Sequence, residues 1–194
     1  MGPSPPKRAG PWDLREHLAR LAYAGGSCAL LLLSGCDTTV FESTYTSIDP
    51  AQCSAPDSVI ENAFKERDLG VQRCPAPGDW MLLLVSSDAN SWIELRRDTV
   101  TWSAEESIVY QSPIGNFPGV TRSIPLEWRS GSAGVRALIL PIAAQDPKDG
   151  ISRITRLFVV RLGPNPPCVL ARVEIQEQAR RIADSDAACP AAQQ

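Results

Sequence analysis

Two cysteine pairs with identical spacing constrain this chain more than any other feature. Among its 194 residues, Cys53 and Cys74 are 21 positions apart, and so are Cys168 and Cys189. Four cysteines allow three pairings, and the equal spacing favours the two local ones, Cys53–Cys74 and Cys168–Cys189. Each closure would stabilise the fold by about 3 kcal/mol. The alternative is a four-thiolate metal site, but structural zinc sites use close C-x-x-C pairs, which this sequence lacks, so we expect no metal.

Disulfides form in oxidising compartments, and the N-terminal segment predicts export to one. The basic residues Lys7, Arg8, Arg15 and Arg20 precede an apolar run over residues 21–33. This run is shorter than the ~20 residues that a helix needs to cross a bilayer. A basic head, a short apolar core and then small residues are the layout of a secretion signal.

The small residues are Leu33-Ser34-Gly35-Cys36, which resemble the lipobox of bacterial lipoproteins. The resemblance implies cleavage before Cys36, a diacylglycerol on its sulfur and an acyl chain such as palmitate on its amino group. The lipid bilayer would then be a partner, and the chain would face the periplasm. Asp37 favours the inner membrane by the enterobacterial rule, with the outer membrane as the other location. The alternative is a cleaved soluble signal or a short anchor helix, with Cys36 as a plain thiol.

The expected organisation is a signal peptide over residues 1–35, a lipidated tether over 36–44, one β-rich domain over 45–190 and a disordered tail over 191–194. About 150 residues are enough for one hydrophobic core.

Short apolar or alternating runs separated by turn residues predict a domain made mostly of strands. The expected strands cover residues 69–73, 80–85, 91–98, 100–102, 107–111, 120–129, 135–142, 151–162 and 168–173, with 151–162 the longest. In the 120–129 run, alternation assigns Val120, Ile124, Leu126 and Trp128 to a buried face. The same alternation assigns Thr121, Ser123, Glu127 and Arg129 to the opposite, solvent-facing side.

The period changes to that of a helix near the C-terminus. Ile175, Ala179, Ile182 and Ala183 are spaced as on one helix face, which predicts a helix over 175–187 held on the last strand by Cys168–Cys189. Residues 59–67 allow a further helical turn or two, and Asp49-Pro50 indicates a turn. The predicted fold class is therefore mainly β, an antiparallel sandwich or barrel-like sheet with a C-terminal α-helix.

The predicted mature chain lacks the residues of most known catalytic sites. Its only histidine, His17, lies in the predicted signal, which excludes Ser-His-Asp and Cys-His systems and histidine-ligated metals. The sequence contains no dinucleotide or P-loop motif, and two disulfides would leave no free thiol. The net charge of −3 gives no basic footprint for nucleic acid. We therefore predict no cofactor, no catalytic residue and no nucleic-acid partner.

The candidate binding surface consists of Trp92, Trp102 and Glu94, because both tryptophans flank polar stretches and exposed tryptophans form binding hot spots. Trp80 and Trp128 are assigned to the core instead. Tryptophan beside carboxylates such as Glu94 and Asp98 is also a sugar-binding combination, and the adjacent Glu105-Glu106 are further carboxylates. A solvated strand edge with core tryptophans is the simpler interpretation. Arg153 and Arg161 lie on one face of the predicted strand 151–162, and Arg156 lies on the other. These arginines are predicted either to bind an anion or to pair with carboxylates of the chain.

The mature part also resembles a family of small exported Gram-negative bacterial proteins without assigned activity. The residues that carry the resemblance are Tyr45-Thr46-Ser47-Ile48-Asp49, Cys74-Pro75, Leu126-Glu127-Trp128-Arg129 and Leu162-Gly163. The resemblance also implies the two local disulfides and supplies no catalytic residue. The predicted function is non-catalytic: a membrane-anchored lipoprotein that binds or assists another envelope protein. The alternative is a carboxylate-dependent hydrolase or glycan-binding protein at the cell wall.

Overall fold

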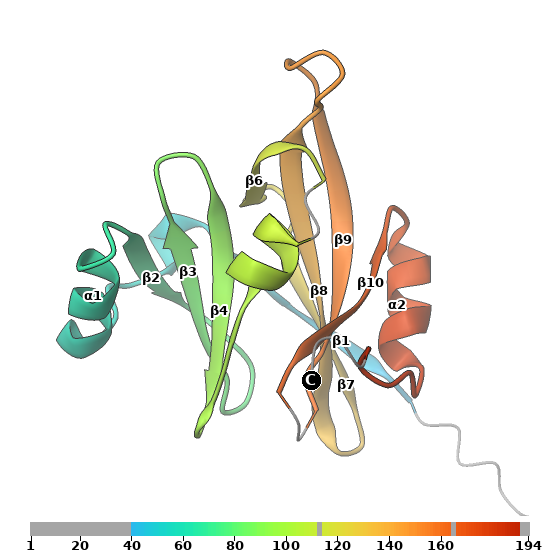
Figure 1. Ribbon diagram of the computed structural model, residues 1–194. Coiled ribbons are helices and arrows are strands. Elements are labelled where there is room, and N and C mark those ends of the chain that lie inside the picture. The colour runs from blue at the N-terminus through green and yellow to red at the C-terminus, as the bar shows by residue number, and fades with distance from the viewer. Residues whose placement is uncertain (1–39, 112–113, 164–165, 191–194) are drawn as a thin grey trace, which may run out of the picture. The chain divides into compact units, whose positions relative to one another are not determined.

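Two antiparallel sheets form the framework of the computed structural model, which describes residues 40–111, 114–163 and 166–190 (Figure 1). Six strands make sheet A: β1 (Glu42–Thr46), β7 (Leu126–Gly131), β8 (Gly134–Gln145), β9 (Arg153–Arg161) and β10 (Cys168–Val173) in spatial order, with β6 (Asn116–Val120) paired to β8. Four strands make sheet B in chain order: β2 (Gly70–Cys74), β3 (Met81–Ser86), β4 (Ser91–Arg97) and β5 (Val100–Ser103). The predicted mainly β fold is confirmed.

Strand β8 lies at the centre of sheet A, where it pairs with β7, β9 and β6. Its side chains are apolar on both faces because both faces are covered: Leu138 and Leu140 belong to one core cluster, and Ala137 and Ile139 to another. The prediction of a central strand over 135–142 is confirmed. The longest strand, however, is β8 rather than the predicted 151–162 segment.

Sheet A is the middle layer of the domain. On one face, residues such as Trp128 and Phe158 share a core with Leu82 and Leu95 of sheet B. The opposite face is covered by the helix α2 (Gln176–Asp184), which Figure 1 shows on the side of sheet A away from sheet B. Ala179 and the other small or apolar residues of this helix pack there. The predicted C-terminal helix is confirmed, and the small alanines let it lie close to the sheet.

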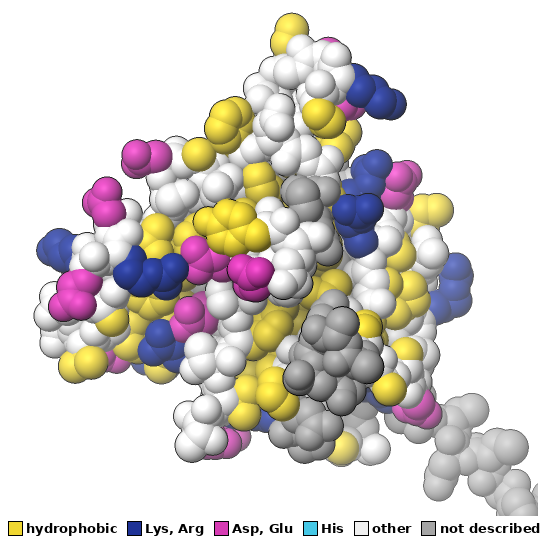
Figure 2. All heavy atoms as spheres, in the orientation of Figure 1, with side chains coloured by type: hydrophobic (Ala, Val, Ile, Leu, Met, Phe, Trp, Pro, Cys, Tyr) yellow, Lys and Arg dark blue, Asp and Glu magenta, His cyan; other side chains and the backbone are white. Residues whose placement is uncertain are grey.

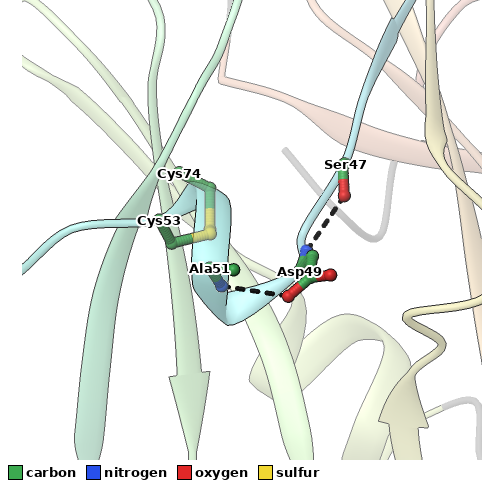
Figure 3. Close-up of a disulfide and its surroundings, with 5 residues drawn as sticks. All are labelled: Ser47, Asp49, Ala51, Cys53 and Cys74. Carbon is green, nitrogen blue, oxygen red and sulfur yellow. Dashed lines mark hydrogen bonds between the residues drawn. A yellow bond between two sulfur atoms is a disulfide. The ribbon is translucent and has the colours of Figure 1, made fainter.

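Both predicted disulfides are present. Cys53 bonds to Cys74 at the end of β2, and Cys168 in β10 bonds to Cys189 beyond α2. The predicted turn at Asp49 is also present and begins the 3-10 helix η1 (Pro50–Gln52). There the Asp49 carboxylate accepts a hydrogen bond from the Ala51 N–H at 2.9 Å (Figure 3). The second disulfide joins the two ends of the segment that carries α2, as the spacing predicted.

A second helix, α1 (Ser58–Lys65), confirms the short helix expected near residues 59–67. It begins where the Asp57 carboxylate accepts from the Ile60 N–H at 3.0 Å, a standard N-cap. Ile60 and Phe64 are buried on one face of the helix. The guanidinium of Arg96 on β4 lies 5.9 Å from the Phe64 ring, so α1 covers the side of β4 that carries Arg96.

Three predicted boundaries or elements are wrong. Residues 107–111 do not form a strand: residues 107–110 belong to the π-helix η2 (Glu105–Tyr110), and Gln111 is its C-cap. The predicted strand over 120–129 is two strands, since β6 ends at Val120 and β7 begins at Leu126, and Pro125, which has no N–H to donate, lies in the break. Strand β1 begins at Glu42, so residues 42–44 belong to the domain rather than to the predicted tether.

Part of the predicted burial in residues 120–129 is also wrong. Ile124, expected in the core, is 39% exposed. Glu127 and Arg129, expected to face solvent, are 1% and 8% exposed. The reason is tertiary: α2 covers this face of β7, and no period in residues 120–129 encodes that.

Candidate interaction surface

The predicted binding surface of Trp92, Trp102 and Glu94 does not exist as one surface. Trp92 is 2% exposed and Glu94 is 7% exposed, so placing them on the surface was wrong. The physical reason is that segments outside sheet B cover both faces of β4: four successive residues, 92–95, are buried, and β6, η2 and α1 all contact this strand. Trp102 is half-buried and pairs with Leu95, which puts it on the opposite face of sheet B from Glu94.

Glu94 is engaged by a neighbour on its own strand. Its carboxylate forms an ion pair with the Arg96 guanidinium at 2.6 Å, and Arg96 in turn lies against the Phe64 ring. The Trp80 and Trp128 assignments, in contrast, are confirmed, with exposures of 6% and 0%. Trp80, Trp92 and Trp128 therefore belong to the core of the sandwich.

The other predicted carboxylates lie near η2. Glu105 forms an ion pair with Arg67, which follows α1, at 2.9 Å. Glu106 accepts a hydrogen bond from the Gln111 side chain at 2.9 Å. Asp98 lies in the turn between β4 and β5 with a φ of 53°.

The π-helix η2 is the first unusual element of the candidate surface. Such helices are rare and occur often at functional sites. Ile108 and Val109 are buried beneath it, whereas Tyr110 at its end is 60% exposed. The helix packs on β4, which buries its apolar side. The Tyr110 ring is left exposed and is accessible to a binding partner.

Strand β6 carries the second unusual residue. Phe117 has a φ of 50° and is 59% exposed. A bulky residue in the left-handed region is strained. The residues before and after Phe117 both pair with β8: Asn116 lies opposite Gln145, and Gly119 lies opposite Ala143, with a bulge between the two pairs. This pairing holds Phe117 in the left-handed conformation. The strained backbone therefore presents an aromatic ring to solvent instead of burying it.

Gly115 allows this arrangement. A Cβ at this position would lie 2.3 Å from the Gln145 carbonyl oxygen, closer than atoms can approach. The glycine thus lets the chain come up to the end of β8 just before Phe117.

We define the η2–β6 surface as Glu106, Tyr110 and Phe117. Both elements contact β4, and Figure 2 shows hydrophobic side chains over η2 and β6 on one face, with acidic side chains beside those of η2. The sequence prediction missed this surface because it assigned residues 107–111 to a strand and began the next strand only at residue 120. An aromatic residue inside the glycine- and proline-containing segment Asn116-Phe117-Pro118-Gly119 was the available signal.

A buried polar network joins β1, β7 and α2 on the far face of sheet A. The Glu127 carboxylate accepts hydrogen bonds from the Ser43 hydroxyl, the Gln176 amide and the Arg180 guanidinium, the last at 2.8 Å. Arg129 forms a bidentate ion pair with Asp184: its Nε donates to Oδ1 at 2.9 Å, and its Nη2 donates to Oδ2 at 2.6 Å. Both charged residues of β7 are thus paired by the helix that covers them.

The network keeps Glu127 ionised. Burial alone would raise the pKa of Glu127, but the hydrogen bonds from Arg180, Ser43 and Gln176, together with the positive charge of Arg180, bring that pKa below its usual range. Arg180 also donates to the Tyr45 hydroxyl at 3.0 Å. A carboxylate held in this way does not exchange protons near neutral pH, so we assign the network to attachment of α2 and β1.

The arginines of β9 have separate contacts. Arg156 forms an ion pair with Glu174 at 2.8 Å, as expected for carboxylate pairing. Arg161 instead donates to two backbone carbonyls at the C-terminal end of α2, that of Ala183 in its last turn at 3.3 Å and that of Ser185 directly after it at 2.5 Å. Arg153 is exposed near the other end of the strand.

Comparison with known proteins returns no relative. No protein-family model matches the chain, and no curated protein or solved structure matches it either. The resemblance to small exported proteins stays a prediction.

Several predictions lie outside the described residues: the signal, the lipidation of Cys36 and the tail over 191–194. Within residues 40–111, 114–163 and 166–190, no helix has the length and apolar character needed to cross a bilayer. In the same part of the chain, no three His, Cys, Asp or Glu side chains gather as a metal site.

Proposed function

We propose that this protein is a membrane-anchored envelope lipoprotein that binds another envelope protein through the η2–β6 surface. The observation that carries the proposal is Phe117, an exposed aromatic residue held in a strained backbone conformation. Strain of this kind persists only where the surrounding structure enforces it, and it gathers at binding and active sites.

A protein partner fits the chemistry of the surface. Tyr110 and Phe117 each leave about three-fifths of their surface exposed. Aromatic side chains dominate the binding energy of protein interfaces because they bury a large area with few rotatable bonds. The neighbouring Glu106 is exposed, so a partner with a basic rim around an apolar pocket would complement it.

The anchor supports the same role. Cys36 in the lipobox-like motif is followed by β1 from Glu42, and six residues span at most about 20 Å. A lipid on Cys36 would therefore keep the domain close to the bilayer. Such tethering raises its effective concentration toward other proteins of the same membrane.

The experiment compares surface variants in the native envelope. Tyr110→Ser and Phe117→Asn remove the two rings, and asparagine tolerates the left-handed conformation. Val59→Ser on α1, where the side chain is 78% exposed, is the matched control. After in vivo cross-linking and affinity purification, mass spectrometry identifies the N-terminal modification and any stoichiometric partner.

We expect an acylated Cys36 and one partner that is lost with both ring variants and kept with Val59→Ser. A partner retained by both ring variants would overturn the assignment to this surface. Recovery of wall glycan in place of a protein would favour the glycan-binding alternative. An unmodified Cys36 would refute the anchor.

A further inference from the structure

Two arginines line a cavity at the end of sheet A where the chain enters the domain. The cavity has a volume of about 370 Å³ and is bounded by the β7–β8 turn (residues 131–134), Arg136, Arg161 and Leu162-Gly163. It shares no residue with the η2–β6 surface. The charged side chains of its wall are the two cations Arg136 and Arg161, whereas the turn contributes only small residues.

Neither arginine is neutralised by a buried carboxylate. Arg136 donates to the Ser185 carbonyl at 2.6 Å and to Asp186 at 3.2 Å, and the Asp186 side chain is 99% exposed. Arg161 donates to the same Ser185 carbonyl at 2.5 Å. The nearby Asp184 is already held by Arg129 through both oxygens. Two guanidinium groups thus converge on one carbonyl, and the solvent-exposed carboxylate of Asp186 pairs with Arg136.

The two cations of the wall also repel each other. Burial lowers the pKa of Arg161 below its ordinary value, and the positive charge of Arg136 lowers it further. An anion in the cavity would relieve this repulsion, and guanidinium groups match phosphate in shape and charge.

The position of the cavity indicates where such an anion comes from. Glu42 at the start of β1 pairs with Ser130, directly before the turn that bounds the cavity. The Phe41 ring lies 5.0 Å from the Arg136 guanidinium. Phe41 is five residues from Cys36, a distance of at most about 18 Å along the chain. A lipid on Cys36 would hold this end of the domain against the bilayer surface.

We propose that the Arg136–Arg161 cavity binds the phosphate of an anionic phospholipid head group in the membrane that anchors the chain. The position of the cavity at the membrane rests on the proposed lipidation of Cys36. The binding of phosphate itself depends only on the two arginines. It would fix the orientation of the domain on the bilayer and so direct the η2–β6 surface toward its partner.

The test uses the full lipidated chain in liposomes of phosphatidylcholine, with or without phosphatidylglycerol and a trace of phosphatidylglycerol carrying a photoreactive head group. Peptide mapping measures cross-linking to the peptide that contains residues 131–134. We expect cross-linking that requires phosphatidylglycerol and falls about fivefold for each of Arg136→Gln and Arg161→Gln, the loss expected for one cation at an anionic surface. Arg153→Gln, on the same strand as Arg161 but distant from the cavity, should keep it.

Because both arginines also bond the segment after α2, Ser132→Glu provides a variant that leaves those bonds intact. Ser132 is exposed in the turn, and a carboxylate there should repel the head group and lower cross-linking as strongly. Equal cross-linking in all variants would overturn the proposal. Full competition by millimolar inorganic phosphate would overturn the lipid source and assign the cavity to a soluble anion.

The Cys36→Ser protein separates this inference from the proposed anchor. Arginine-dependent cross-linking to phosphatidylglycerol vesicles by that protein would support the cavity even if native Cys36 were unmodified. Cross-linking lost in Cys36→Ser while native Cys36 is acylated would mean that the cavity has no affinity of its own, which would also overturn the proposal.

Discussion

Replacing Glu127 by Gln should destabilise the domain more than any other single change of charge on sheet A. The carboxylate is 1% exposed and accepts from Ser43, Gln176 and Arg180. Glutamine has nearly the same size, so packing is kept. Its amide, however, carries no charge and can turn an N–H toward the Arg180 guanidinium. Removing one partner of a buried pair costs about 3 to 5 kcal/mol.

We place the loss for Glu127→Gln at the lower end, about 3 kcal/mol, because the Arg180 side chain is 38% exposed and water can solvate it after the change. That is a large part of the ~5 to 15 kcal/mol by which domains are normally stable. Urea unfolding at pH 7, followed by circular dichroism with both disulfides intact, measures it. Glu177→Gln, an exposed residue on the same helix, is the control and should change stability by less than about 0.5 kcal/mol.

The pH dependence provides an independent check. The folded-state pKa of Glu127 lies below its usual value, so its contribution is fully present above the unfolded pKa of about 4.3. The contribution is lost as the pH falls through the folded pKa. Wild-type protein should therefore lose stability on acidification, and Glu127→Gln should lose less. Equal urea midpoints at pH 7 for wild type and Glu127→Gln, or identical acid dependence, would refute the reasoning.

Three further predictions concern packing, cross-linking and strain. Ala183→Leu should destabilise by about 1 to 3 kcal/mol, since Ala183 is 0% exposed between α2 and sheet A and larger side chains overpack such sites; thermal melts should show no such loss for the exposed Gln178→Leu. Cys168→Ser with Cys189→Ser should cost about 3 kcal/mol and raise hydrogen exchange in α2, whereas unchanged exchange would show that the bond does not hold the helix. Phe117→Asn should raise the free energy of unfolding by up to about 1 kcal/mol because asparagine relieves the left-handed strain, and a clear decrease in urea unfolding would contradict that account.

The local pattern of the sequence determined most of the framework. The spacing of the cysteines was enough to choose both disulfides, because short loops close at the lowest entropic cost. Apolar runs predicted β3, β8 and β10, and the small residues at helical spacing predicted α2. These features depend on neighbours within one element or one short loop, so a period or a separation along the chain encodes them.

Only the tertiary structure decided which faces are covered. Alternation placed Glu127 and Arg129 in solvent, but α2 supplies Arg180 and Asp184 from about fifty positions further along the chain and buries both. Trp92 was assigned to the surface from its polar neighbours, yet it is buried in the core because distant segments such as β6 and η2 pack on β4. Phe117 is exposed for the converse reason: pairing on either side of it holds a conformation that phenylalanine does not choose locally. Burial, ion pairing and strain are set by contacts between distant segments, and the period of a single segment cannot report them.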